Sequence, residues 1–198
     1  YGTQPLGALR LSGTVGYAFD DLSQKRNFAG IGVAEGDHVG HEFTAALQAA
    51  MPVAVGGGTL TPSIGARYAY FHGNAFGEDG ARGQNLRVGV DSARSLQPYV
   101  GLAFDQSFDH DGKPLDLQLR AGYATETAGR HRGVTVAAQD GTLFAAPGTD
   151  LPRSYATLGA SLAMHPTKAS TLALRYDALL NVGHASAQAA SVTFSYRF

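Results

Sequence analysis

The sequence has no cysteine and no tryptophan among its 198 residues, and only 16% of them are charged. The absence of cysteine excludes disulfides, zinc–thiolate sites, iron–sulfur clusters and thiol nucleophiles. A formal net charge of −1 provides no basic surface, so nucleic-acid binding is not expected. Long hydrophobic runs are missing too. The most apolar stretch, residues 45–55, is interrupted by Gln48 and Pro52, whereas a membrane-spanning helix needs about 18 to 20 apolar residues.

The sequence instead has glycine and a strict alternation of apolar with small or polar residues. Glycine occurs 26 times and 44% of the residues are hydrophobic, yet the mean hydropathy is only −0.10. From Leu115 to Tyr123, every odd position is apolar, and Asp116, Gln118 and Arg120 occupy even positions. A period of two gives each face of a β-strand one kind of side chain. The sequence therefore predicts an all-β fold.

Ten segments bounded by Gly, Pro, Asp or Asn clusters are predicted as strands of an antiparallel up-and-down sheet. They cover residues 8–19, 24–34, 41–54, 59–71, 84–91, 96–107, 114–126, 155–164, 171–180 and 188–198. Several exceed the roughly five or six residues usual in soluble sheets. Long alternating strands are typical of a transmembrane β-barrel, whose apolar face meets lipid and whose other face lines the lumen. A soluble sandwich with a solvated polar face is the alternative.

The polar positions of these strands carry six of the twelve arginines and several carboxylates. We expect these groups to line the lumen and to pair across it, because guanidinium and carboxylate groups form bidentate pairs in confined sites. The predicted lumen-lining residues are Arg10, Arg67, Arg87, Arg120, Arg175, Arg197, Asp91, Asp105, Asp116, Glu126 and Asp177. The aromatic residues predicted to form girdles at the membrane interfaces are Tyr17, Phe19, Tyr68, Tyr70, Phe71, Tyr155 and Phe198.

Two groups of residues have the composition of a catalytic or metal site. The segment 109–111 (Asp-His-Asp) sets carboxylates beside an imidazole, and His38 and His41 have ligand-like spacing. Both groups lie in predicted turns and lack the three or four converging ligands that a metal ion needs. The Gly-Gly-Gly run at 56–58 has no phosphate-loop lysine and is predicted as a hairpin turn. We expect no catalytic residues, no metal and no cofactor.

Several short motifs follow one another in an order that resembles a known family. They are Leu60-Thr61-Pro62 before Gly65-Ala66-Arg67-Tyr68, Phe76-Gly77-Glu78-Asp79-Gly80, Ser95-Leu96-Gln97-Pro98 with Gly101-Leu102, the strand Leu115 to Glu126, Pro152-Arg153-Ser154-Tyr155-Ala156-Thr157-Leu158-Gly159-Ala160 before Tyr176-Asp177, and Ser191-Val192-Thr193-Phe194-Ser195-Tyr196-Arg197-Phe198. Over essentially the whole chain they resemble the C-terminal β-barrel (translocator) domain of bacterial autotransporters, the type V secretion family. The resemblance implies one domain over residues 1–198, located in the bacterial outer membrane.

The last eight residues form the most informative single motif. Val192, Phe194, Tyr196 and Phe198 alternate up to a terminal aromatic residue. This pattern resembles the signal by which the barrel-assembly machinery recognises outer-membrane proteins. Any final strand that faces lipid would show the same alternation, so a purely structural role is the alternative.

The resemblance implies a non-catalytic function: an outer-membrane anchor and translocation conduit for an N-terminal passenger. The expected partners are outer-membrane lipid and lipopolysaccharide, the barrel-assembly machinery and the upstream passenger. Family barrels have twelve strands around a pore helix, so ten strands imply that two strands, the helix and the passenger lie outside this sequence. The alternatives are a passive outer-membrane pore or structural barrel, and a ten-stranded outer-membrane protease. The candidate rim residues of such a protease are Asp20, Asp21, His131, Asp140, Asp150 and His184.

The orientation follows from strand parity if the C-terminus lies in the periplasm. Residues 128–153 and 181–188 are then predicted outside the cell, and 109–113 and 165–170 on the periplasmic side. Residues 72–83 are predicted as a long periplasmic turn. The Arg-His-Arg segment at 130–132 would pair with lipopolysaccharide phosphates or remain a solvated loop.

Overall fold

The computed structural model of the chain describes all residues except 111, 130–132, 149–152, 168, 182–185 and 198. Apart from a 3₁₀ turn at Arg82–Gln84, its regular elements are strands, and every paired set is antiparallel, which confirms the predicted all-β fold. The strands are β1 (Gly2–Leu6), β2 (Leu9–Phe28), β3 (Gly32–Ala50), β4 (Val53–Val55), β5 (Gly58–Gly73), β6 (Phe76–Gly77), β7 (Leu86–Val88), β8 (Asp91–His110), β9 (Lys113–Thr125), β10 (Gly133–Ala138), β11 (Leu143–Pro147), β12 (Ser154–Thr167), β13 (Ser170–Asn181) and β14 (Ser186–Tyr196).

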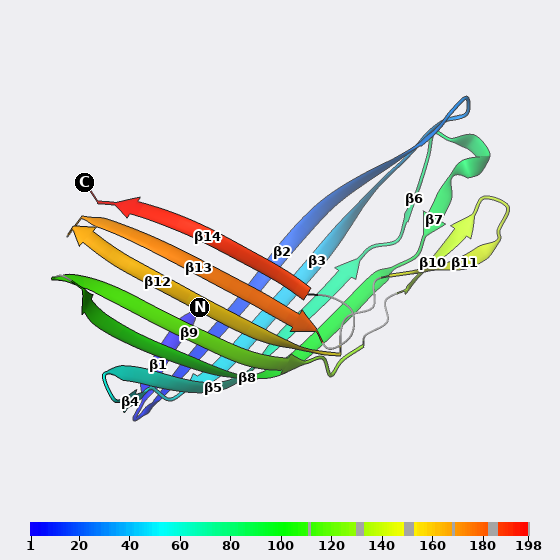
Figure 1. Ribbon diagram of the computed structural model, residues 1–198. Helices are drawn as coiled ribbons and strands as arrows, with labels where there is room; N and C mark the ends of the chain where they lie inside the picture. The colour runs from blue at the N-terminus through cyan, green and yellow to red at the C-terminus, as the bar shows by residue number, and fades with distance from the viewer. Residues whose placement is uncertain (111, 130–132, 149–152, 168, 182–185, 198) are drawn as a thin grey trace.

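The main sheet contains ten of these strands within the described residues. Its order is β1-β2-β3-β5-β8-β9-β12-β13-β14, with β4 added beside β5. The long strands therefore pair in the order in which they follow along the chain, as an up-and-down sheet does. The sheet curves, so that β12, β13 and β14 pass in front of β2 and β3 in Figure 1. Among the described residues it stays open, and β1 and β14 are its two edges.

Two of the ten predicted segments are wrong. Residues 24–34 are not a separate strand: they end β2, turn, and begin β3, with Phe28 paired to Gly32. Residues 84–91 do not cross the sheet, because they contain the short strand β7 and only the first residue of β8. The main sheet nevertheless has ten strands, because it includes the short strands β1 and β4, which were not predicted. The tip of the β2–β3 hairpin has two glycines at positive φ, Gly30 at 75° and Gly32 at 149°, with the apolar Ile31 between them.

The connections at the two ends of the sheet differ in length. At one end β1–β2, β8–β9 and β12–β13 are joined by tight turns, and β4 turns into β5 through the predicted glycine hairpin, with Val55 paired to Gly58. At the other end lie the β2–β3 tip and the connections 74–90 and 126–153. The prediction that residues 72–83 share the end of 109–113 is wrong. Because 84–91 is not a crossing strand, β5 leads directly into β8 and its connection lies at the long-loop end.

A small extension projects from the long-loop end, at the upper right of Figure 1. Its sheet has the order β11-β10-β7-β6, and an isolated bridge between Glu35 and Asp79 ties it to β3. Ala34 and Ala81 are fully buried there. The backbones approach so closely that a Cβ on Gly32 would lie 2.4 Å from the carbonyl oxygen of Gly80, so only glycine fits at Gly32.

One buried carboxylate holds this extension together. Glu78 accepts hydrogen bonds from the guanidinium of Arg26, from Gln24 Nε2 at 2.9 Å and from the backbone N–H of Leu86 at 2.8 Å. The hydrogen bonds from Arg26 lower the pKa of Glu78 below its ordinary value, although burial acts in the opposite direction. Glu78 therefore joins the end of β2 to the segment that contains β6 and β7.

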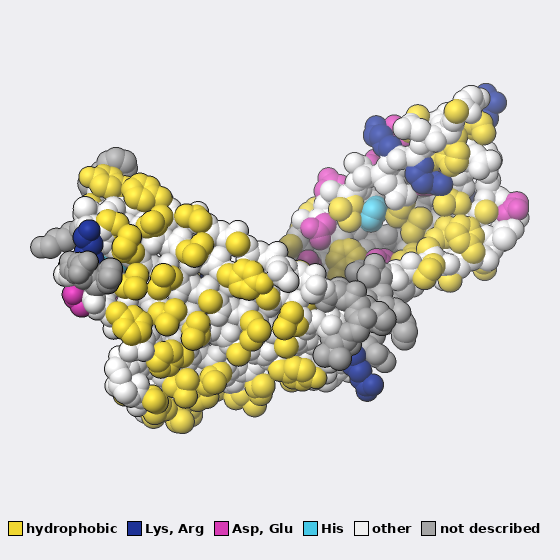
Figure 2. All heavy atoms as spheres, viewed as in Figure 1, with side chains coloured by type: hydrophobic (Ala, Val, Ile, Leu, Met, Phe, Trp, Pro, Cys, Tyr) yellow, Lys and Arg dark blue, Asp and Glu magenta, His cyan; other side chains and the backbone are white. Residues whose placement is uncertain are grey.

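The main sheet has almost no buried core of its own. No large side chain of the described residues is fully buried, while Leu47, Ile64 and Val192 are 64%, 62% and 70% exposed. Figure 2 shows apolar side chains covering the surface of β9, β12, β13 and β14 that faces the viewer, with charged side chains gathered on the extension. Among the described residues, no helix is both long and apolar enough to cross a membrane.

Candidate functional site

The register of the main sheet sorts its side chains into two faces of opposite character. We call a row the set of residues paired side by side across neighbouring strands. One row contains Leu117, Leu162, Leu174 and Val192, and the next contains Phe104, Leu119, Ala160 and Tyr176. Because side chains alternate along each strand, these rows all lie on one side of the sheet. We call this side the apolar face.

The intervening rows form the polar face. One contains Ala103, Arg120, Gly159 and Asp177, and its neighbour contains Asp105, Gln118, Ser161 and Arg175. Eight of the predicted lumen-lining residues lie on main-sheet strands on this face: Arg10, Arg67, Asp91, Asp105, Asp116, Arg120, Arg175 and Asp177.

An arginine–carboxylate cluster lies at the centre of the polar face. Arg120 Nη2 lies 2.8 Å from Asp177 Oδ1, and Arg175 Nε lies 2.6 Å from Asp177 Oδ2. Arg120 and Asp177 are two strands apart, and the residue between them is Gly159. A Cβ there would lie 2.9 Å from Asp177 Oδ1 and 3.0 Å from Arg120 Nε, so the glycine leaves the space through which the pair meets. The side chains remain 31% and 43% exposed, as expected for a wet surface rather than a dry core.

Two further carboxylates lie on the same face, nearer the short-turn end. Asp116 accepts hydrogen bonds from Ser107 Oγ at 2.6 Å and contacts His165 Nε2 at 3.0 Å. Asp105 accepts one from Gln118 Nε2 at 2.7 Å. Residues from three neighbouring strands thus supply the partners of these acids. The predicted lumen-lining set omits Gln118, although Gln118 occupies a polar position of an alternating segment, and it omits His165, which was predicted to lie in the 165–170 turn and instead belongs to β12.

The polar face is hollowed between β3 and β12. A pocket of about 220 Å³ is lined by residues that include Gln48, Arg67 and Tyr99. The guanidinium of Arg67 lies 4.4 Å from the centre of the Tyr99 ring, a cation–π contact rather than an ion pair. Tyr99 in turn lies over Gly65, where a Cβ would be 2.6 Å from the phenol oxygen.

Glu126 is a buried carboxylate at the long-loop end of the main sheet. It lies directly after β9, is 5% exposed, and accepts hydrogen bonds from Ser95 Oγ, the Leu96 N–H and Gln97 Nε2. The Ala128 N–H supplies a fourth at 2.9 Å. Burial raises the pKa of Glu126, but these hydrogen bonds outweigh it and leave the pKa below its ordinary value. The carboxylate thereby fixes the start of the 126–153 connection against β8.

Some predicted positions are wrong. Arg87 lies on β7 of the small sheet, not on a main-sheet strand, because residues 84–91 do not form a crossing strand. Phe71 and Tyr155 belong to the polar face rather than to an outward girdle: Phe71 contacts Gly40, and Tyr155 donates a hydrogen bond to Gln97 Oε1 at 2.8 Å. In both strands the aromatic residue occupies a position whose side chain lies on the polar face.

The remaining predicted positions lie near the chain end or on the apolar face. Arg197 follows β14, and its N–H donates to the Ala169 carbonyl. Val192, Phe194 and Tyr196 lie on the exposed strand β14, on the apolar face. Phe198 lies outside the described residues, as do residues 130–132 and the rim candidates His131, Asp150 and His184.

The groups considered for metal binding or catalysis lie apart. His41 belongs to the apolar face of β3, whereas His38 stacks on Phe76 at 4.3 Å between ring centres. Residue 111 of the 109–111 segment lies outside the described residues. Within the described part of the chain, no three His, Asp or Glu residues converge in a way that could hold a metal ion.

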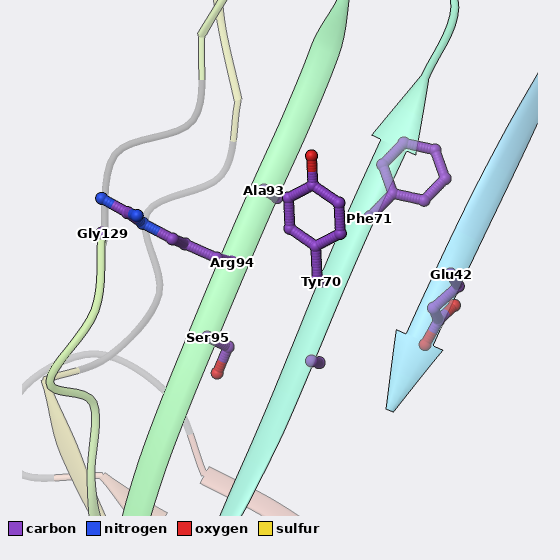
Figure 3. Close-up of a pocket in the computed structure, with 8 residues that line it drawn as sticks. Glu42, Tyr70, Phe71, Ala93, Arg94, Ser95 and Gly129 are labelled. Atoms are coloured by element: carbon purple, nitrogen blue, oxygen red, sulfur yellow. The ribbon is translucent and has the colours of Figure 1, made fainter. Parts of the chain in front are cut away.

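A second pocket, of about 380 Å³, opens at the long-loop end. It is drawn in Figure 3, where Tyr70 and Phe71 extend from β5, and Arg94 extends from β8 toward Gly129 and away from Tyr70. Glu42 and Ser95 also line it. Arg94 is exposed and forms no ion pair with any described residue. The lining of this pocket therefore combines two aromatic side chains with a guanidinium, a carboxylate and a hydroxyl group.

Comparison with known proteins identifies the family. A search of curated proteins finds no match. A family model described as the autotransporter beta-domain matches residues 1–177, which is most of the chain and confirms the resemblance found in its motifs. The chain therefore belongs to the autotransporter beta-domain family.

Proposed function

We propose that this domain anchors its protein in the bacterial outer membrane and forms the conduit through which an N-terminal passenger reaches the cell surface, without catalysing a reaction. Membership of the autotransporter beta-domain family supports the outer-membrane translocator role. The proposal adds to this role that a passenger moves through the domain and that the domain catalyses no reaction.

The observation that carries the proposal is the division of one curved sheet into two faces. Large apolar side chains are exposed in aligned rows on the apolar face, and ion-paired and hydrogen-bonded groups occupy the other. Exposed apolar patches of this extent are unfavourable in water but favourable against hydrocarbon. The longest strands, β2 and β8, have 20 residues each, more than the roughly 9 to 11 needed to cross a bilayer.

The polar face is suited to a passing polypeptide. Arg120 and Arg175 share the carboxylate of Asp177, and Arg67 lies over the ring of Tyr99, so these three guanidinium groups already have partners and bind a transiting chain less strongly. Gly159 and Gly65 carry no side chain of their own, and the space above them is occupied by the Arg120–Asp177 pair and by the ring of Tyr99. Because the charged groups of this hydrated polar surface are paired with one another, an extended chain can slide along it without being held at a deep binding site.

The orientation follows from the connections. We place the tight turns in the periplasm and the extension outside the cell, because barrels of this class have short periplasmic turns and long extracellular loops. On this arrangement the exposed strand β14, with Val192, Phe194 and Tyr196, is the surface offered to the barrel-assembly machinery.

A cross-linking experiment tests the conduit directly, since the native sequence has no cysteine. In the full-length parent protein, Ser161→Cys is introduced on the polar face and Leu162→Cys on the apolar face as its matched control. A passenger carrying one cysteine and a folded obstacle is stalled during export. We expect a disulfide from position 161 to the passenger and none from position 162.

Two outcomes contradict the proposal. Equal cross-linking from both positions means that the passenger does not run along the polar face. A passenger that reaches the surface without any cross-link from position 161 means that it travels elsewhere, and bilayer recordings then test the alternative of a passive pore.

A further inference from the structure

The small sheet of the extension ends in a strand that has a neighbour on one side only. Among the described strands, β11 pairs with β10 alone and forms the edge of the order β11-β10-β7-β6. Edge strands usually carry a lysine or another charge that prevents pairing with a further chain. The five residues of β11 include no charged residue, and Leu143 and Phe144 are exposed on it. This edge is therefore open to another strand.

The hydrogen bonds of the β10–β11 hairpin determine which backbone groups of β11 are free. The N–H of Ala138 donates to the carbonyl of Thr142 at 2.8 Å. Because bonded and non-bonded pairs alternate along antiparallel strands, Phe144 also turns its N–H and C=O toward β10. Leu143 and Ala145 turn theirs away from it. The free edge thus presents the N–H and C=O groups of these two residues.

This short edge is complementary to a second copy of itself. When two β11 strands run antiparallel with Phe144 opposite the second copy's Phe144, Leu143 of each copy lies opposite Ala145 of the other. Each of these pairs exchanges two N–H···O=C bonds, so all four free groups of each copy find partners. Pro147 has no N–H, and a register centred on Ala145 would leave the Leu143 carbonyl unpaired. The backbone therefore favours the register centred on Phe144.

The side chains favour the same register. Phe76, Val88, Val136 and Phe144 form one apolar row across the small sheet. The row is covered as far as β10, since Phe76 stacks on His38 and Val136 is 5% exposed, but Phe144 at the edge is 45% exposed. A two-fold axis perpendicular to the sheet sets both copies of Phe144 side by side on one face, with Cα atoms roughly 4.5 Å apart. Aromatic pairs in this position stabilise a sheet.

The direction of β11 determines how the two copies lie. In Figure 1 the β10–β11 hairpin points away from the main sheet. The two-fold axis that relates antiparallel strands reverses the second hairpin, so the second main sheet lies on the far side of the pair. Because the proposed function places the extension outside the cell, the two main sheets then belong to membranes that face each other.

We propose that β11 binds β11 of a second copy of this chain in a facing membrane, and that the two small sheets become one continuous sheet. The inference goes beyond the proposed function but rests on its orientation of the domain. Two strands of five residues bury far less than the roughly 800 Å² per partner of a stable interface, so a single contact is weak. Many copies on two opposed surfaces strengthen it by multivalency. The additional activity is attachment of one bacterial surface to another.

The first test uses the full chain in lipid nanodiscs with one chain per disc, and mass photometry counts paired discs as the concentration rises. Ala145→Pro removes one outward N–H from each copy, and with it two of the four hydrogen bonds between them, while the bonds to β10 remain. Ala145→Ser keeps this N–H and is the matched control. We expect about tenfold weaker pairing of the proline variant and native pairing of the control.

A disulfide tests the register, since the native chain has no cysteine. Phe144→Cys is expected to link two discs, because Cα atoms that face each other in a non-bonded pair lie within disulfide reach. Ala145→Cys is the control. It lies opposite Leu143 of the second copy, so two Ala145→Cys chains are expected to remain unlinked.

The results that overturn the inference are distinct from those that refute the proposed function. Native discs that do not pair, equal pairing of native and proline variant, or equal linkage at positions 144 and 145 each overturn the inference. Linkage only in discs that hold two chains overturns it too, because both copies then lie in one membrane. So does shielding of Phe144→Cys from a membrane-impermeant maleimide without a disulfide, since a strand of another protein then covers the edge.

Heat-dependent gel mobility reports membrane folding separately. Its absence in the native protein refutes the proposed function, whereas a folded native protein whose discs remain single refutes only the pairing of β11.

Discussion

Gly65 offers a sharp test of how closely the strands of the main sheet pack. A Cβ at this position would lie 2.5 Å from the Leu47 carbonyl oxygen and 2.6 Å from Tyr99 Cζ, whereas ordinary contacts begin at 3.4 Å. Gly65→Ala therefore requires the backbone of β3 to move by about 0.9 Å, the difference between the two distances. Overpacking of this kind costs about 1 to 3 kcal/mol. Replacing glycine in a strand recovers about 0.5 to 1 kcal/mol, so we expect a net loss of up to about 2.5 kcal/mol.

The measurement is urea unfolding of the detergent-folded protein, followed by far-ultraviolet circular dichroism because the chain lacks tryptophan. Gly13→Ala is the matched control, since its Cβ would meet only Ala46 O at 3.8 Å and Leu47 Cδ1 at 3.9 Å. We expect the control to be as stable as the native protein or slightly more stable. If Gly65→Ala unfolds at the same urea concentration as Gly13→Ala, the close approach of β3, β5 and β8 at this glycine is refuted.

Three further predictions concern the polar cluster, the extension and the lipid-facing surface. Asp177→Asn should lower the urea midpoint more than Arg120→Gln, because it strands two guanidinium groups; equal midpoints would argue against a shared carboxylate. The pKa of Glu78 is lowered in the folded protein, so the carboxylate stabilises the extension above its ordinary pKa of 4.5, and this contribution is lost as the pH falls below that value. Hydrogen exchange of residues 74–88 should rise there in the native protein but be independent of pH in Glu78→Gln, after correction for the intrinsic exchange rate. Leu162→Arg should cost about 2 to 4 kcal/mol of stability in bilayers, while Ser161→Arg on the polar face should cost much less, and equal losses would contradict the assignment of faces.

The division into faces could be predicted from the sequence because the period of two depends only on local geometry. Leu117, Leu119 and Tyr123 alternate with Gln118 and the other polar residues of β9, and the structure aligns each set with the same set on its neighbours. The predicted segments 114–126 and 171–180 agree with β9 and β13 to within one residue at each end, whereas the segment 8–19 ends well before β2 does, at Phe28.

The errors arose where tertiary contacts overrode the local pattern. Residues 24–34 keep a strand-like composition through the tip of a hairpin, so the turn at Gly30 carries little signal. Residues 84–91 are also strand-forming, but β7 pairs with β10 from a distant connection, which the local sequence does not specify. Because residues 84–91 were predicted as a crossing strand, the 72–83 connection was assigned to the wrong end of the sheet.

The site was predictable in composition but not in pairing. Arg120, Arg175 and Asp177 were expected among the polar residues, yet the glycine that lets them meet became visible only when the register was known. Arg67 contacts a ring instead of a carboxylate, because Tyr99 lies beside it on β8. Such contacts depend on which strands are neighbours.

The central claim is that one face of the sheet meets lipid and the other meets water. Because the native chain has no cysteine, single cysteines along β12 report this directly through their reaction with a membrane-impermeant maleimide in lipid vesicles. The account predicts labelling of Ser161→Cys and Ala163→Cys and protection of Ala160→Cys and Leu162→Cys, with a period of two. Uniform labelling of all four positions, or protection of the polar set, would contradict it.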